Sequence, residues 1–253
     1  MKRTNLYLVL VLLVSACGPA GDKSGTISAC SSTLKALAAL TGGLEVPANF
    51  QTSNPVKTGG EFDVMQFFKV LDSLSMQPGY TLDYVYHFDG MGGYPLLYVR
   101  PTDQPPYTSE ADLPASYDRS GYLDFVQVDD TPESYFQLML LARMGDQFYQ
   151  YWHAAYADSQ IVCDKAGVTT IVSGLNGDFG RRIPPAAWVQ AHLLKDIEPT
   201  SVVGEQTVEV RLVTFTLWGG FYANTYLIDR SMPHTIQVVE EKNIVPYDCG
   251  VMF

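Results

Sequence analysis

The chain has 253 residues, of which 47% are hydrophobic and 12% aromatic. This much apolar material excludes a disordered or low-complexity protein and is enough for one large domain or two small ones. The 27 acidic residues outnumber the 16 basic ones, so the formal net charge is −11 at pH 7. A chain this acidic has no electrostatic basis for binding nucleic acid, whose phosphates would repel it.

The start of the chain has the layout of an export signal. Lys2 and Arg3 precede an unbroken apolar run over residues 6–14, and small residues follow it. This run is too short to remain in a bilayer as a spanning helix. The pattern therefore predicts a cleaved signal peptide over residues 1–16.

The segment Val14-Ser15-Ala16-Cys17, directly after the apolar run, resembles the lipobox of bacterial lipoproteins. The resemblance implies that cleavage makes Cys17 the first residue, with a diacylglycerol on its sulfur and an acyl chain on its amine. Two or three acyl chains anchor a protein stably where one does not. The alternative is an ordinary signal peptide cut near Ala16, with Cys17 an incidental thiol.

Loss of the leader would leave 14 basic and 27 acidic residues, a net charge of −13. Anionic headgroups would repel such a surface, so lipid rather than charge must hold the protein to a membrane. We expect an exported protein anchored at the outer face of the cell membrane, or at the outer membrane in a Gram-negative host. Residues 17–29 are small and polar and predict a flexible tether that reaches roughly 20 Å.

The remaining residues, 30–253, predict a single domain of helices and strands. Helices are expected over 30–40 and 61–75, and another over 184–194. Two hairpins are expected, each with a Gly-Gly turn. Their strands cover 80–88 with 94–100, and 207–217 with 221–230. Further strands are expected over 122–128, 234–240 and 244–253.

The strongest helical pattern covers residues 131–162. A cap residue, a proline and an acidic residue (Thr131, Pro132 and Glu133) mark its start. Apolar residues then recur at helical spacing over most of the circumference, which predicts a long, central, buried helix.

The two halves of the domain, residues 30–130 and 165–253, share an order of helix, hairpin and further strand around the central helix. This order fits either a decayed duplication or two ordinary hairpins. Strands joined by short turns predict an α+β fold, with a largely antiparallel sheet and helices packed on one face.

Three cysteines remain beside Cys17, so at most one disulfide forms within the domain. We expect Cys163 and Cys249 to pair because both lie in apolar contexts, although Cys30 could replace either partner. There is no CxxC pair and no Cys/His cluster at zinc spacing, so neither a metal nor a cofactor is predicted.

Two Cys/His pairs could supply an exported hydrolase with a thiolate nucleophile and a base. They are Cys163 with His153 and Cys249 with His234, with Asp158, Asp164 or Asp248 as the orienting third group. Neither pair lies in a recognisable catalytic signature, so the hydrolase is the alternative function rather than the main one.

The aromatic residues around the second Gly-Gly turn suit a contact surface. Trp218, Phe221 and Tyr222 lie at or beside this turn, and such rings beside polar groups are typical of binding faces. The main prediction is therefore a membrane-anchored, exported lipoprotein that acts by binding or as an envelope component. No protein or small-molecule partner is identified by the sequence.

Overall fold

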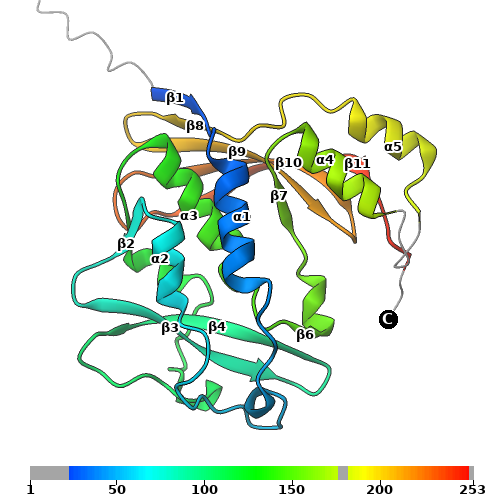
Figure 1. The fold of residues 1–253 in the computed structure, drawn as a ribbon. Coiled ribbons are helices and arrows are strands. Elements are labelled where there is room, and N and C mark those ends of the chain that lie inside the picture. Colours follow the sequence, from blue (N-terminus) through cyan, green and yellow to red (C-terminus); the bar gives the residue numbers. More distant parts are fainter. Residues whose placement is uncertain (1–22, 176–181, 251–253) are drawn as a thin grey trace, which may run out of the picture.

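The largest sheet is six-stranded and antiparallel, in the order β1-β8-β9-β10-β11, with β7 beside β8 along the same edge of β9. The computed structural model describes residues 23–175 and 182–250 (Figure 1). The strands of this sheet are β1 (Lys23–Thr26), β7 (Gln160–Val162), β8 (Thr200–Val203), β9 (Thr207–Thr216), β10 (Gly220–Asp229) and β11 (Ile236–Pro246).

Two smaller antiparallel sheets come mainly from the first half of the chain. One is three-stranded, with β3 (Tyr80–Phe88), β4 (Gly92–Pro101) and β6 (Tyr151–Trp152), and the other pairs β2 (Leu74–Met76) with β5 (Val126–Val128). The helices are α1 (Cys30–Thr41), α2 (Phe67–Val70), α3 (Pro132–Met144), α4 (Lys165–Gly174) and α5 (Pro185–His192). The predicted α+β class, with antiparallel sheets and two hairpins, is confirmed.

Helices lie on both faces of the six-stranded sheet, whereas the sequence led us to expect them on one. Val208, Val210 and Leu212 of β9 belong to the larger core cluster, which α1, α2 and α3 also line. Val213 and Phe215 belong to a second cluster, together with apolar residues of α4 and α5. β9 therefore buries opposite faces at its two ends, and each buried face needs its own cover.

Helix α3 begins where the sequence predicted, but it ends at Met144 rather than at residue 162. Thr131 caps it, since the Thr131 hydroxyl accepts from Ser134 N at 3.2 Å. After the helix, Tyr149 and Trp152 have φ angles of 51° and 43°, which a right-handed helix does not allow. The apolar pattern continued past the helix because this irregular segment also contributes rings to the core.

The prediction of a flexible tether over residues 17–29 is wrong for residues 23–26. Lys23–Thr26 form β1, which pairs with β8 from Lys23 opposite Val203 to Thr26 opposite Thr200. The free edge of β8 offers hydrogen-bonding groups to this segment, and these outweigh its weak strand propensity. Residues 1–22, which hold the leader and the lipobox, lie outside the described residues.

The predicted Cys163–Cys249 disulfide is wrong. Cys30 and Cys163 form the disulfide, with their Cα atoms 5.6 Å apart, and Cys249 is a buried free thiol. Cys163 lies in the larger core cluster and Cys249 in the second, on the other side of the sheet. A contact between the starts of α1 and α4 supports the observed pairing, because Ser31 Oγ donates to Asp164 Oδ2 at 2.9 Å.

Candidate binding site

The structure separates the three aromatic residues predicted as a contact surface. Trp218 and Tyr222 are partly exposed and line a shallow hollow of about 460 Å³ beside Asn243 and Asp248. Phe221 is fully buried and packs on Phe215, with ring centroids 4.8 Å apart. The prediction for Phe221 is wrong, because alternation along β10 turns this side chain toward α4 and α5.

The second Gly-Gly turn is covered by the chain that follows β11, rather than projecting as a free hairpin tip. Tyr247 N donates to Gly219 O at 3.2 Å, and Cys249 N donates to Leu217 O at 3.0 Å. Gly220 has a φ of +90°, a conformation that L side chains rarely adopt. The turn therefore needs its glycine and offers less free surface than the sequence indicated.

The largest hollow is a groove of about 1030 Å³ on the outer face of the six-stranded sheet, the face that α4 and α5 cover only at one end. Its floor includes a row of side chains that runs across five neighbouring strands. In strand order this row is Thr26, Thr200, Arg211, Thr225 and Glu240, each paired with the next in the sheet register. All five residues line the groove.

The groove is polar and carries charges of both signs. Its wall is the segment 194–198 that follows α5, which includes Lys195 and Asp196. On the floor, Arg211 pairs with Glu209 at 2.7 Å, and both side chains remain accessible to solvent. Hydroxyl, carboxylate and guanidinium groups together can donate and accept hydrogen bonds toward one polar ligand. The volume also falls at the upper end of the range common for small-molecule sites.

Sequence reasoning missed this groove because its residues come from five strands spread over most of the chain. One local signal was present along β9. Thr207, Glu209 and Arg211 alternate with Val208 and Val210, a pattern typical of a strand with one solvent-facing side. That pattern identifies the solvent-facing side of β9, but it does not show which residues of the adjacent strands lie beside Arg211.

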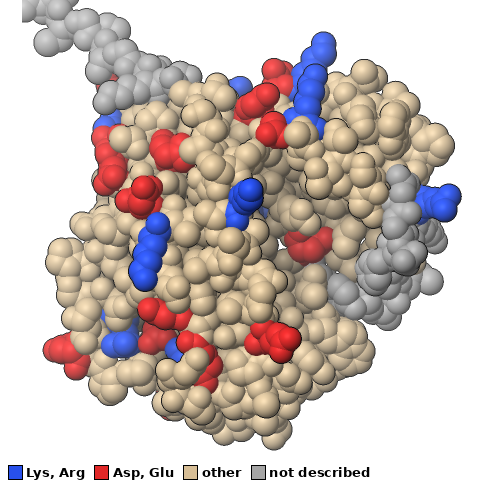
Figure 2. Space-filling view, viewed as in Figure 1, with Lys and Arg blue, Asp and Glu red and all other residues tan. Residues whose placement is uncertain are grey.

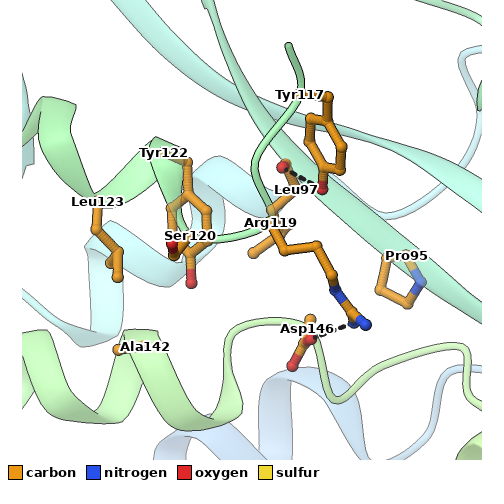
Figure 3. Close-up of a pocket in the computed structure, with 9 residues that line it drawn as sticks. All are labelled: Pro95, Leu97, Tyr117, Arg119, Ser120, Tyr122, Leu123, Ala142 and Asp146. Carbon is orange, nitrogen blue, oxygen red and sulfur yellow. Dashed lines mark hydrogen bonds and ion pairs between the residues drawn. The ribbon is translucent and has the colours of Figure 1, made fainter. Parts of the chain in front are cut away.

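A smaller hollow of about 160 Å³ lies between the segment after β4 and the end of α3 (Figure 3). Arg119 pairs there with Asp146 at 3.2 Å, and its guanidinium lies 4.7 Å from the Tyr94 ring centroid. Burial raises the pKa of Asp146, and the nearby Arg119 charge opposes this shift.

The tyrosine hydroxyls beside this hollow have internal partners. Tyr117 OH donates to Leu97 O at 3.0 Å, and Tyr122 OH donates to Leu141 O at 3.2 Å. The polar groups of this hollow therefore hold the loop to the fold. We therefore assign it a structural role.

The residues proposed for a hydrolase have other partners. Cys163 is held in the disulfide, and Cys249 is buried in the second core cluster. His234 packs on Tyr135 with ring centroids 6.1 Å apart, and its Nδ1 lies 2.9 Å from Asp229 O. A thiolate nucleophile needs an accessible thiol beside its base, and neither predicted pair meets this condition.

The candidate orienting groups also have structural roles. Asp158 accepts hydrogen bonds from Thr216 Oγ1 at 2.5 Å and Leu217 N at 2.7 Å, which ties the segment before β7 to the end of β9. Asp164 caps α4 by accepting from Gly167 N at 2.7 Å. Over residues 23–175 and 182–250, no cluster of three His, Cys, Asp or Glu side chains is arranged to hold a metal ion.

No family model, curated protein or solved structure matches this chain. Among the helices of the described part, none has both the length and the apolar character needed to cross a membrane. Acidic and basic side chains are interspersed over the face seen in Figure 2. The groove on the outer face of the six-stranded sheet is the largest of the candidate sites described above.

Proposed function

We propose that the chain is an exported lipoprotein, anchored through lipid on Cys17, whose folded domain binds a polar ligand in the groove across β8, β9 and β10. The observation that carries the proposal is the Cys30–Cys163 disulfide. Disulfides persist in exported proteins and are rare in reducing compartments. The lipobox-like segment before the domain supplies the anchor in this proposal.

The distance from the anchor to the fold is short. β1 begins at Lys23, so five residues separate Cys17 from the sheet, and even a fully extended segment of this length spans only about 20 Å. A lipid on Cys17 would thus hold the folded domain close to the bilayer. Because the mature chain is strongly acidic, its attachment would rest on lipid rather than on charge.

The groove favours a hydroxyl-rich ligand without net charge. Arg211 opposes a cationic group at the centre of the row. The four acidic residues of the lining outnumber Arg211 and Lys195, so the groove as a whole opposes an anionic ligand. Sugar hydroxyls donate and accept at once, and therefore suit the Thr200 and Thr225 hydroxyls as well as the charged groups. A neutral oligosaccharide is the ligand class that this lining supports best.

Detergent partition tests the anchor. In a bacterial expression host, the full chain is expected in the detergent phase, and the Cys17→Ala variant in the aqueous phase. Cys249→Ala is the matched control, because it removes a cysteine elsewhere and should leave partition unchanged. Equal partition of the full chain and Cys17→Ala would overturn the lipoprotein proposal.

Titration with maltotetraose tests the groove. Backbone amide resonances of β9 and β10 around Arg211 and Thr225 should shift on addition of the sugar, and Arg211→Ala should weaken this response. Arg119→Ala serves as the control, since Arg119 is an arginine in the smaller hollow of Figure 3. Shifts confined to residues away from the groove, or no shifts at millimolar sugar, would contradict the ligand class.

A further inference from the structure

A further hollow, separate from the groove, lies between α1, α2 and α3 and has a volume of about 200 Å³. These helices belong to one region of the molecule in Figure 1. The hollow's lining is mainly apolar and comes from all three helices. The apolar side chains that line it are Leu37 and Ala38 of α1, Phe67 of α2 and the adjacent Leu71, and Leu140, Leu141 and Met144 of α3.

The deeper walls of this hollow are apolar and tightly packed. Phe67, Leu71, Leu140 and Leu141 are each at most 2% exposed, so their positions are fixed by the surrounding core. An engineered apolar cavity of about 150 Å³ remains free of water and binds benzene. A hollow of about 200 Å³ lined by the same residue types therefore has room for an alkyl chain of roughly six to eight carbons.

The mouth of the hollow has the opposite character. α1 ends at Thr41 and α3 at Met144, and the residues that follow these ends, Gly42 and Gly145, both line the hollow. Backbone carbonyls at a helix C-terminus carry a partial negative charge. Thr41 O and Met144 O already accept hydrogen bonds from Leu44 N and Gln147 N, so each offers a head group only its second lone pair. The two helix ends at this opening still favour a head that donates a hydrogen bond and disfavour a carboxylate.

We propose that this hollow is a binding site for a medium-chain amphiphile, with its alkyl tail among the leucines and a hydroxyl or amine head at the ends of α1 and α3. The tail is selected by the apolar interior, and the head by the electronegative mouth. The site is independent of the proposed lipid on Cys17 and of the groove on the sheet.

Titration of the folded domain, with its methionine methyl groups ¹³C-labelled, tests the site. The probes are 1-hexanol, hexylamine and hexanoate, which share a tail and differ in the head. Hexanol and hexylamine should shift the Met144 methyl resonance and show nuclear Overhauser contacts to it. Hexanoate should bind about three- to ten-fold more weakly, because its charge meets the two helix ends.

Two variants on neighbouring positions of α1 provide the matched pair. Both alanines are exposed to solvent, but only Ala38 lines the hollow. Ala38→Leu should fill the space and abolish hexanol binding, and Ala39→Leu should leave it unchanged. The Overhauser contacts in the unsubstituted protein keep the test decisive even if Ala38→Leu does not fold.

Three results would overturn the proposal. The first is the absence of any Met144 contact with hexanol or hexylamine near their solubility limits. The second is hexanol binding that survives Ala38→Leu in a folded protein. The third is hexanoate binding as tightly as hexanol, which would remove the argument from the helix ends.

Discussion

The apolar hollow between α1, α2 and α3 and the groove on the six-stranded sheet differ in almost every physical respect. The hollow between α1, α2 and α3 is small, lined by buried apolar side chains and built into the core. The groove on the sheet is several times larger, polar and open, and its row of residues faces solvent. Substitutions beside the apolar hollow should therefore cost stability, whereas those in the groove should change binding with little effect on folding.

Loss of the disulfide should have the largest effect on stability. This effect should be greatest around the apolar hollow. Cys30 starts α1, one wall of the apolar hollow, and the bond closes a loop with a sequence separation of 133. Replacing Cys30 and Cys163 by serine is expected to lower the free energy of unfolding by about 2–5 kcal/mol in urea titrations. Cys249→Ala, which keeps the bond, should cost less.

Enlarging the apolar hollow should cause the next largest loss of stability. Leu71 is fully buried and lines it, so Leu71→Ala is expected to lower the free energy of unfolding by about 2–4 kcal/mol. The added space should let 1-octanol bind more tightly relative to 1-hexanol than in the unsubstituted protein. An unchanged ratio of their dissociation constants would show that Leu71 does not bound the site.

Acid should destabilise the segment that leads into α2. Burial works against the ionised Glu61 carboxylate, but hydrogen bonds from Thr58 and Asn49 outweigh it and lower the pKa of Glu61 to about 2. A folded-state pKa below the usual 4.5 contributes stability that is complete above pH 4.5 and is lost as the pH falls toward 2.

The Glu61→Gln variant provides the comparison for this pH effect. Thermal unfolding followed between pH 5 and pH 2 should show a smaller fall in the melting temperature for the variant than for the unsubstituted protein. Parallel curves for the two proteins would mean that Glu61 does not stabilise this segment by being ionised.

Substitution in the groove should have the smallest effect on folding. Arg211 and Glu209 form an ion pair whose side chains are 65% and 35% exposed, and such pairs contribute about 0–1 kcal/mol. Arg211→Ala should change the free energy of unfolding by less than about 0.5 kcal/mol while weakening maltotetraose binding. A loss of stability as large as that of Leu71→Ala would break the contrast between the two hollows.

The class of fold and both hairpins could be predicted from local patterns. Turn glycines such as Gly220 have a backbone conformation that few other residues adopt, and Thr131 caps α3 through its own hydroxyl. These features depend on neighbours in sequence. They can therefore be identified from the sequence alone.

The sites could not be predicted in the same way, since they depend on which strands become neighbours. Arg211 and Glu240 share a row only because β9, β10 and β11 are adjacent in register. The Cys30 pairing was missed for the same reason, because its partner lies 133 residues away across the fold. Likewise, Phe148 and Tyr149 kept a helical spacing although the chain there is not a helix.

The central claim, export with a lipid on Cys17, is tested most directly by mass spectrometry of the detergent-extracted protein digested without reduction. The account predicts an N-terminal peptide that begins at Cys17 and carries diacylglycerol and an amide-linked acyl chain, a peptide pair joined through Cys30 and Cys163, and a free Cys249 thiol. An unmodified chain that retains residues 1–16, with both Cys30 and Cys163 reduced, would contradict it.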